Sequence, residues 1–133
     1  MDNSLGTWKL NLEKSKVTPP LPVKSLTTKR VASNGGVQVT TTGVQADGAP
    51  INANYTVKYD GKECPVTGGP YDTVSMKQVD ANTFTGTAKQ AKGKFNATIQ
   101  TVISKDGKAM TSTVSGTDAD GNALNGTLVY DKQ

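Results

Sequence analysis

Three tyrosines have the chemistry best suited to contact a bound molecule. Tyr55 and Tyr59 fall on one side of an extended segment 51–59, and Tyr130 falls on the presumed inward side of the last segment. A tyrosine offers an apolar ring and a hydroxyl that needs a hydrogen-bond partner when buried. The three residues therefore predict contacts to a small apolar or amphipathic molecule. The alternative is that they are core residues whose hydroxyls reach the backbone or water.

Arg30 is the only arginine in the chain. Its guanidinium would help to orient a bound molecule if its strand turns this side chain inward. Apolar residues that share the inward register complete the predicted binding set. The predicted ligand-binding residues are Arg30, Tyr55, Tyr59, Phe95, Ile99 and Tyr130.

The sequence predicts no catalytic residue, no metal ligand set and no cofactor. Histidine is absent, which removes the usual general base and the commonest metal ligand, and Cys64 as a nucleophile would lack its histidine. No phosphate-binding loop, dinucleotide fingerprint or nucleophile elbow is present. Asp118, Asp120 and Asn122 resemble the start of a calcium loop, but alanine occupies the sixth position, where glycine belongs. Hairpin-turn chemistry explains these residues better.

Composition narrows the class of protein. The 133 residues fit one domain over 1–133, and the net charge is +4. The basic residues are nearly all lysines spread along the chain, and aromatic residues are few, so nucleic-acid binding is not expected. No apolar run approaches the roughly 18 residues of a membrane helix. Seven aromatic residues scarcely supply the girdles of an outer-membrane barrel.

Alternating patterns and tight turns predict the elements that position these residues. Leu5–Leu12 reads as a strand with Trp8, Leu10 and Leu12 on a buried face. Residues 13–25 contain Pro19, Pro20 and Pro22 and predict an extended, polyproline-like loop, with a flexible surface loop as the alternative. Beyond it, strands alternate with turn signals, which are Asn34-Gly35-Gly36, Asp47-Gly48, Asp60-Gly61, Asp80-Ala81-Asn82, Asp106-Gly107 and Asp120-Gly121.

The segment 62–71 is less regular, and Pro65 and Pro70 indicate a broken or edge strand there. About ten strands at this spacing predict an all-β barrel or sandwich without helices. Because nearly every connection is a tight turn, neighbouring strands should pair antiparallel, with the first and last regions of the chain meeting. Residues 32–60 also resemble residues 104–131, either through duplication, which would place the units on opposite walls, or through convergent turn chemistry.

Gly6-Thr7-Trp8 in the first strand and Leu128–Lys132 in the last resemble the calycin group, which comprises lipocalins and intracellular fatty-acid-binding proteins. The resemblance implies an up-and-down antiparallel barrel in which the tryptophan closes one end, and the strand count resembles the fatty-acid-binding type. The chain departs from this pattern in having no helical segment for a lid. An Arg-x-Tyr pair near the C-terminus grips the ligand carboxylate in those relatives. Here Tyr130 matches the tyrosine, but Leu128 replaces the arginine.

A ten-stranded barrel is wider than the eight-stranded kind that side chains can fill. We expect a cavity, left open by small inward residues, namely Ala53, Ala88, Ala97 and Gly126. The alternative is a flattened barrel with two sheets about 10 Å apart. A cavity favours a binding protein for a small hydrophobic or amphipathic molecule. It also permits an enzyme using tyrosine, lysine or carboxylate as acid or base, whereas a filled interior favours a structural or adhesive module.

Two expectations concern the setting of the protein. The short start, Met1 to Ser4, suits a mature exported domain, in the periplasm or secreted. We expect a monomer or a weak homodimer.

Overall fold

The computed structural model describes residues 4–18, 23–33, 35–68, 71–90, 92–118 and 120–133. Over these ranges the chain forms β-strands and no helix, and hence no helix suited to cross a membrane. The strands are β1 (Gly6–Leu10), β2 (Lys16–Thr18), β3 (Val23–Ser33), β4 (Gly36–Gln45), β5 (Pro50–Val57), β6 (Cys64–Pro65), β7 (Thr73–Gln78), β8 (Thr83–Lys89), β9 (Asn96–Ile103), β10 (Ala109–Thr117) and β11 (Ala123–Lys132). The predictions for the Pro19–Pro22 stretch, Asn34 and Pro70 lie outside the described residues, as do those for Met1 to Asn3.

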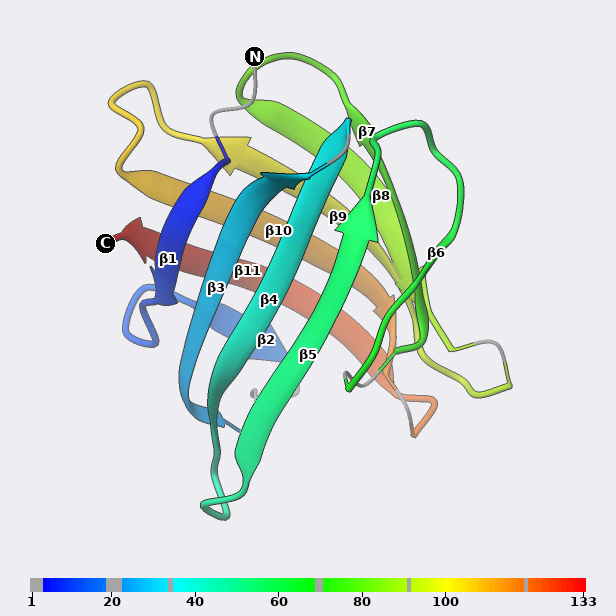
Figure 1. Cartoon of the computed structure of the whole chain (residues 1–133). Helices are drawn as coiled ribbons and strands as arrows, with labels where there is room; N and C mark the ends of the chain where they lie inside the picture. Colours follow the sequence, from blue (N-terminus) through cyan, green and yellow to red (C-terminus); the bar gives the residue numbers. More distant parts are fainter. Residues whose placement is uncertain (1–3, 19–22, 34, 69–70, 91, 119) are drawn as a thin grey trace.

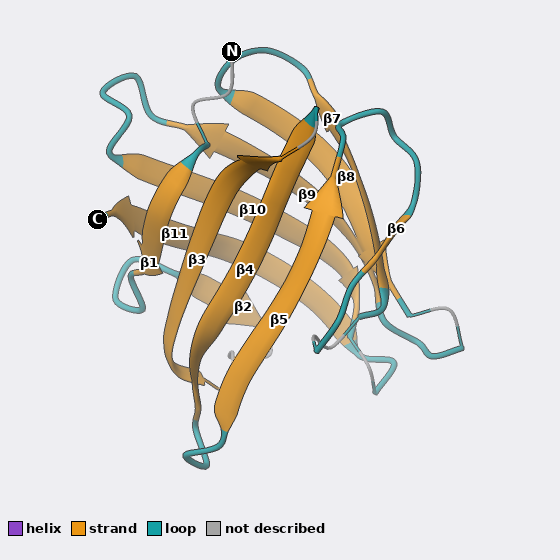
Figure 2. Cartoon of the chain, in the orientation of Figure 1, coloured by secondary structure: helices purple, strands orange, loops and turns teal. Residues whose placement is uncertain are grey.

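The strands form one antiparallel sheet that curls into a nearly closed barrel (Figures 1 and 2). Ten strands follow one another in the order β5-β4-β3-β1-β11-β10-β9-β8-β7-β6, and β2 pairs with β11. The first and last long strands meet, since β1 pairs with both β3 and β11. The predicted fold class, an all-β antiparallel barrel of about ten strands without a helical lid, is confirmed.

The sheet is least continuous where its two ends meet, between β5 and the segment that contains β6. There the described chain has two isolated bridges, Asn54 with Thr67 and Asp60 with Lys77. The first is a reciprocal pair, in which the N–H of each residue donates to the carbonyl of the other at 2.9 Å. Pro65 lies in the two-residue strand β6, as the prediction of a broken strand requires.

Alternation along each strand separates the interior from the solvent. In β9 the buried residues Ala97, Thr101 and Ile103 alternate with exposed ones, as a strand with one buried face requires. Trp8 and Leu10 are buried in β1, as predicted. Leu12 is 45% exposed, however, so its predicted burial is wrong. The strand ends at Leu10, and Leu12 lies in the turn that follows it.

The acidic turn residues hold their own turns together. The Asp118 carboxylate accepts hydrogen bonds from the backbone N–H groups of Asp120 and Asn122, at 3.0 and 2.9 Å. The Asp106 carboxylate accepts one from the N–H of Lys108 at 3.0 Å. Carboxylates that bond to the backbone two residues further on form Asx turns, which favour a hairpin reversal. These residues are therefore explained by turn geometry.

The two similar segments of the sequence lie on opposite walls of the barrel, one around the β4–β5 hairpin and the other around the β10–β11 hairpin (Figure 1). Their terminal tyrosines differ. Tyr130 is buried inside β11, whereas Tyr59 follows the end of β5 and has a φ of 60°. The similarity therefore extends to the hairpins and not to the position of the tyrosine.

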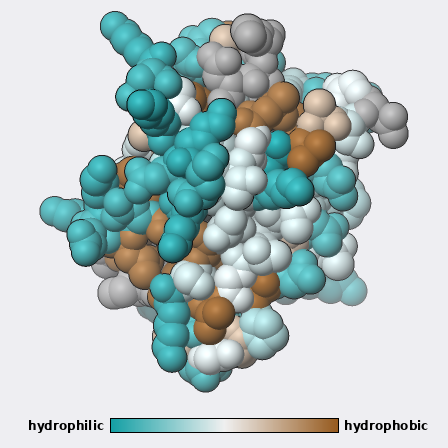
Figure 3. Space-filling view, turned by 60° about the vertical axis from the view of Figure 1, so that its left-hand side comes forward, coloured by the Kyte–Doolittle hydropathy of each residue, from teal (hydrophilic) through white to brown (hydrophobic). Residues whose placement is uncertain are grey.

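The best-buried part of the core closes the barrel near the N-terminus. Trp8 is fully buried, and its indole N–H donates to the Ser4 carbonyl at 2.9 Å. Phe84 is also fully buried and packs against the Tyr59 ring at 5.1 Å. On the face shown in Figure 3, hydrophobic side chains form small separate groups between hydrophilic ones.

Candidate functional site

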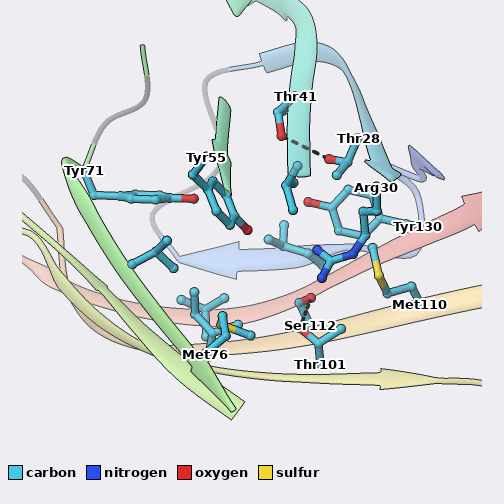
Figure 4. A pocket seen from close by; sticks show the side chains of 15 residues that line it. Thr28, Arg30, Thr41, Tyr55, Tyr71, Met76, Thr101, Met110, Ser112 and Tyr130 are labelled. Atoms are coloured by element: carbon cyan, nitrogen blue, oxygen red, sulfur yellow. Dashed lines mark hydrogen bonds between the residues drawn. The ribbon is translucent and has the colours of Figure 1, made fainter. Parts of the chain in front are cut away.

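The interior of the barrel holds a cavity of about 130 Å³ that is partly open to solvent (Figure 4). Its wall combines apolar side chains with hydroxyl groups and one guanidinium, and all but one of its residues lie in strands. The lining residues are Thr28, Arg30, Val39, Thr41, Tyr55, Tyr71, Val74, Met76, Ile99, Thr101, Met110, Ser112, Val114, Leu128 and Tyr130. A cavity with this mixture can hold a small molecule by apolar contact and fix its orientation by hydrogen bonds.

The small residues expected to leave this space open do not line it. Ala88 and Ala97 are buried in β8 and β9, and the cavity is bordered by larger side chains, including Met76 and Ile99. The prediction of a cavity is therefore confirmed, but the small residues named for it do not border the space. The space exists because the ten-stranded circumference is wider than these side chains can fill.

Arg30 lies in β3 with its side chain turned inward and only 8% exposed. Its Nε donates to the Ser4 hydroxyl at 3.0 Å, and one terminal N–H group donates to the Tyr59 hydroxyl at 2.9 Å. Among the described residues that line the cavity, Arg30 carries the only formal charge. The interior is thus electropositive at this point, and two hydroxyls help to fix the guanidinium.

Two pairs of hydroxyls add polar groups to the wall. The Thr28 and Thr41 hydroxyls lie 3.3 Å apart across β3 and β4, and those of Thr101 and Ser112 lie 2.9 Å apart across β9 and β10. In each pair the residues are direct partners in the strand register. Such pairs satisfy each other in a partly buried wall, and each hydroxyl can still exchange its partner for a ligand atom.

The hydroxyls of Tyr55, Tyr71 and Tyr130 face the cavity (Figure 4). Burial raises the pKa of Tyr130 to about 12, and the nearby Tyr55 phenol adds to this increase, while Arg30 and the Thr28 hydroxyl oppose it. Burial of the phenol, with Tyr55 and Tyr130 as neighbours, raises the pKa of Tyr71 still further. Part of the Tyr71 side chain is exposed, but its hydroxyl points into the cavity (Figure 4). The Tyr71 and Tyr130 phenols therefore remain protonated at neutral pH and can donate hydrogen bonds.

Four of the six predicted binding residues line the cavity, namely Arg30, Tyr55, Ile99 and Tyr130. Tyr59 and Phe95 do not line it. Tyr59 follows the end of β5 at Val57, and its hydroxyl accepts a hydrogen bond from Arg30. Phe95 precedes β9 and stacks on Tyr71 with 5.4 Å between ring centroids. Direct contact of these residues with a ligand stays a prediction.

Several lining residues were not predicted from the sequence. Tyr71 lies in the irregular stretch before β7, where no alternation indicates the direction of a side chain. Thr101 and Ser112 follow the inward alternation of their strands, and an inward hydroxyl in an apolar register is the signal that could have identified them. Met76 and Met110 carry the same inward signal, but a methionine there is as consistent with core packing as with a cavity wall.

The wall offers little acid–base chemistry. An enzyme of the type considered above would use tyrosine, lysine or carboxylate as acid or base, and of these the described lining residues include tyrosine but neither lysine nor carboxylate. No group of three potential metal-ligating side chains occurs in the described part of the chain. The titratable groups around the cavity are the phenols and the guanidinium, which suit hydrogen bonding and charge recognition.

Comparison with solved structures identifies the architecture. The chain aligns with zebrafish ileal bile-acid-binding protein, solved in complex with cholic acid, with a TM-score of 0.54 over 99% of this chain and 100% of that one. The chain has the calycin fold. The two sequences are 14% identical, so the likeness concerns the fold alone. No model of a protein family matches the chain, and no curated protein matches it significantly.

The calycin fold in this chain places its cation on an unexpected strand. Leu128 and Tyr130 both line the cavity from β11, which leaves the arginine position of the Arg-x-Tyr pair apolar. Arg30 reaches the same cavity from β3. Both β3 and β11 pair with β1. A charged side chain on either strand would therefore point into the interior from the same part of the barrel.

Proposed function

We propose that the protein binds a small amphipathic molecule inside its barrel. The observation that carries this proposal is the cavity, whose wall brings Arg30 and paired hydroxyls together with aliphatic side chains. The bile-acid complex of the zebrafish protein supports the use of such a barrel interior for a ligand. The chemistry of the cavity wall, and not the structural similarity to the zebrafish protein, indicates a molecule with both apolar and polar groups.

Burial of apolar surface supplies the affinity in this proposal. Each 100 Å² of ligand surface removed from water contributes about 2.5 kcal/mol before the cost of association. Val74, Met76 and Ile99 provide the apolar contacts. The hydroxyls give little affinity by themselves, since they exchange water for ligand, but together with the guanidinium they select the orientation of the molecule.

Mass spectrometry tests the proposal directly. We expect protein purified from its native source to release a small molecule on denaturation, and the purified apo-protein to bind a fluorescent apolar probe that an extract of that source displaces. Val114→Phe fills the cavity from β10 and should abolish probe binding, whereas Thr113→Phe, on the exposed face of the same strand, should not. An empty extract together with no probe binding would contradict the proposal.

A further inference from the structure

We infer that the ligand is a single-ring compound with one negative charge, of the aryl carboxylate class, with its anion beside Arg30. This inference rests on the proposed function and names the class of molecule that the same cavity selects. It is carried by the volume of the cavity and by the separation of its polar and aromatic sides.

The space inside the barrel fits about one ring. An engineered protein cavity of about 150 Å³ lined by aliphatic and aromatic side chains holds one benzene molecule. The partly open cavity here has about 130 Å³. Cholic acid, with four fused rings, and long-chain acids need several times that space and would have to extend beyond it. A single ring therefore fits the interior more completely than these bulkier ligands do.

The two sides of the cavity differ in chemistry. Figure 4 shows Tyr55 and Tyr71 together on one side, and Arg30, Tyr130 and Ser112 on the other. A compact molecule that spans this space meets aromatic rings at one end and a cation with hydroxyls at the other. A ring that carries a single acidic group has this polarity.

Arg30 provides the selection for charge. A guanidinium binds a carboxylate through charge-assisted hydrogen bonds, which are roughly twice as strong as neutral ones. Because the side chain is only 8% exposed, the attraction acts in a medium that screens it less than water does. The hydroxyls of Tyr130 and Ser112 can donate to the same anion, and the tyrosine is protonated at neutral pH.

The opposite side suits the ring. Tyr55 and Tyr71 offer aromatic surfaces, Met76 offers a polarizable thioether, and Val74 and Ile99 complete an apolar wall. The Tyr71 ring is itself held by its stack on Phe95. A flat ring gains offset or edge contacts with two tyrosines, which a flexible short chain of equal volume does not.

Titration calorimetry of the full chain with benzoate and benzamide tests the inference. The two molecules have nearly the same shape and differ in charge. We expect benzoate to bind at least about tenfold more tightly than benzamide, and cholate and octadecanoate to bind more weakly than benzoate. In Arg30→Met the preference for benzoate over benzamide should fall to within about twofold, while benzamide affinity stays the same.

Two further variants keep the result interpretable. Arg30→Lys retains the charge and should retain part of the preference, even if loss of the guanidinium in Arg30→Met disturbs folding. Ile99→Trp fills the ring side and should weaken benzoate and benzamide alike. The comparison of benzoate with benzamide on the wild-type protein tests the inference without any variant.

The possible outcomes separate this inference from the proposed function. If the wild-type protein binds benzamide as tightly as benzoate, or binds cholate more tightly than either, the inference is wrong while lumen binding stands. If none of these compounds binds but a native-source extract displaces the apolar probe, the named class is again wrong. If nothing binds and nothing is displaced, the proposed function itself fails.

Discussion

The Thr101–Ser112 hydroxyl pair allows a quantitative test of how this interior is built. The two oxygens lie 2.9 Å apart, and the residues are 7% and 8% exposed. Thr101→Val keeps the shape of the side chain and removes one partner of the hydrogen bond. The same holds for Ser112→Ala, which removes a single oxygen atom. Each variant therefore leaves one hydroxyl in the wall without its cross-strand partner.

The expected loss of folding stability differs between the single variants and the double variant. A buried hydroxyl that loses its partner costs about 1–3 kcal/mol of folding stability, whereas replacing both partners by apolar groups of similar shape is nearly neutral. We therefore expect each single variant to lower the free energy of unfolding by about 1–2 kcal/mol. The double variant should be within about 1 kcal/mol of wild type, which gives a coupling energy of about 1–2 kcal/mol. Urea denaturation followed by tryptophan fluorescence measures the free energy of unfolding of the wild type, the two single variants and the double variant.

The chain supplies a matched control on its outer surface. The hydroxyls of Ser75 and Thr87 lie 3.0 Å apart across β7 and β8, at the same separation but exposed to solvent. Water replaces either partner there, so Ser75→Ala and Thr87→Val should be additive within about 0.5 kcal/mol. If the interior pair also proves additive, with single effects below about 0.5 kcal/mol, water in the cavity solvates both hydroxyls and the reasoning is refuted.

Three other predictions concern packing, titration and solvent access. Gly68→Ala should destabilise the protein by about 2 kcal/mol more than Gly107→Ala in urea denaturation. Both glycines have positive φ, but an added methyl group overlaps with the Asn52 carbonyl only at Gly68, so equal effects would disprove the close approach of this segment to β5. The stability of the protein should fall from about pH 10 upward, because the unfolded state loses the Tyr130 proton near 10 and the folded state near 12, and Tyr71, whose pKa is raised further, adds to the fall. Tyr130→Phe should flatten this fall in pH-dependent urea denaturation, and an unchanged slope would argue against the raised pKa. Iodide should quench the fully buried Trp8 only after unfolding, so efficient quenching of the native protein would contradict a closed barrel end.

The fold was predictable because it depends on patterns that strands impose directly. Ile51, Ala53, Tyr55 and Val57 alternate with exposed polar residues, and β5 keeps this register over its whole length. Turn residues separated the strands at intervals that only a meander satisfies. The meeting of β1 with β11 then follows from the need to cover the edges of a long antiparallel sheet.

The site was predictable only where its residues belong to regular strands. Arg30, Tyr55 and Tyr130 line the cavity because their strands continue the expected alternation. Tyr59 follows the end of a strand and has a left-handed backbone, so the two-residue period no longer applied to it. Tyr71 lies in a stretch whose path depends on the closure of the barrel. That closure is a property of the whole sheet, and no local pattern encodes it.

The location of the positive charge shows what the interior of this fold constrains. Gly6 pairs with Arg30 on one side of β1, and Leu10 pairs with Tyr130 on the other, so β3 and β11 deliver their inward side chains to neighbouring parts of one cavity. A ligand responds to the field inside the cavity and not to the strand from which the charge comes. A positive charge on β3 therefore faces the same cavity that a charge on β11 would face. The volume that remains beside Arg30 then sets the size of the molecule that fits. The side chains of Leu128 and Val114 occupy part of the wall that smaller residues would leave open.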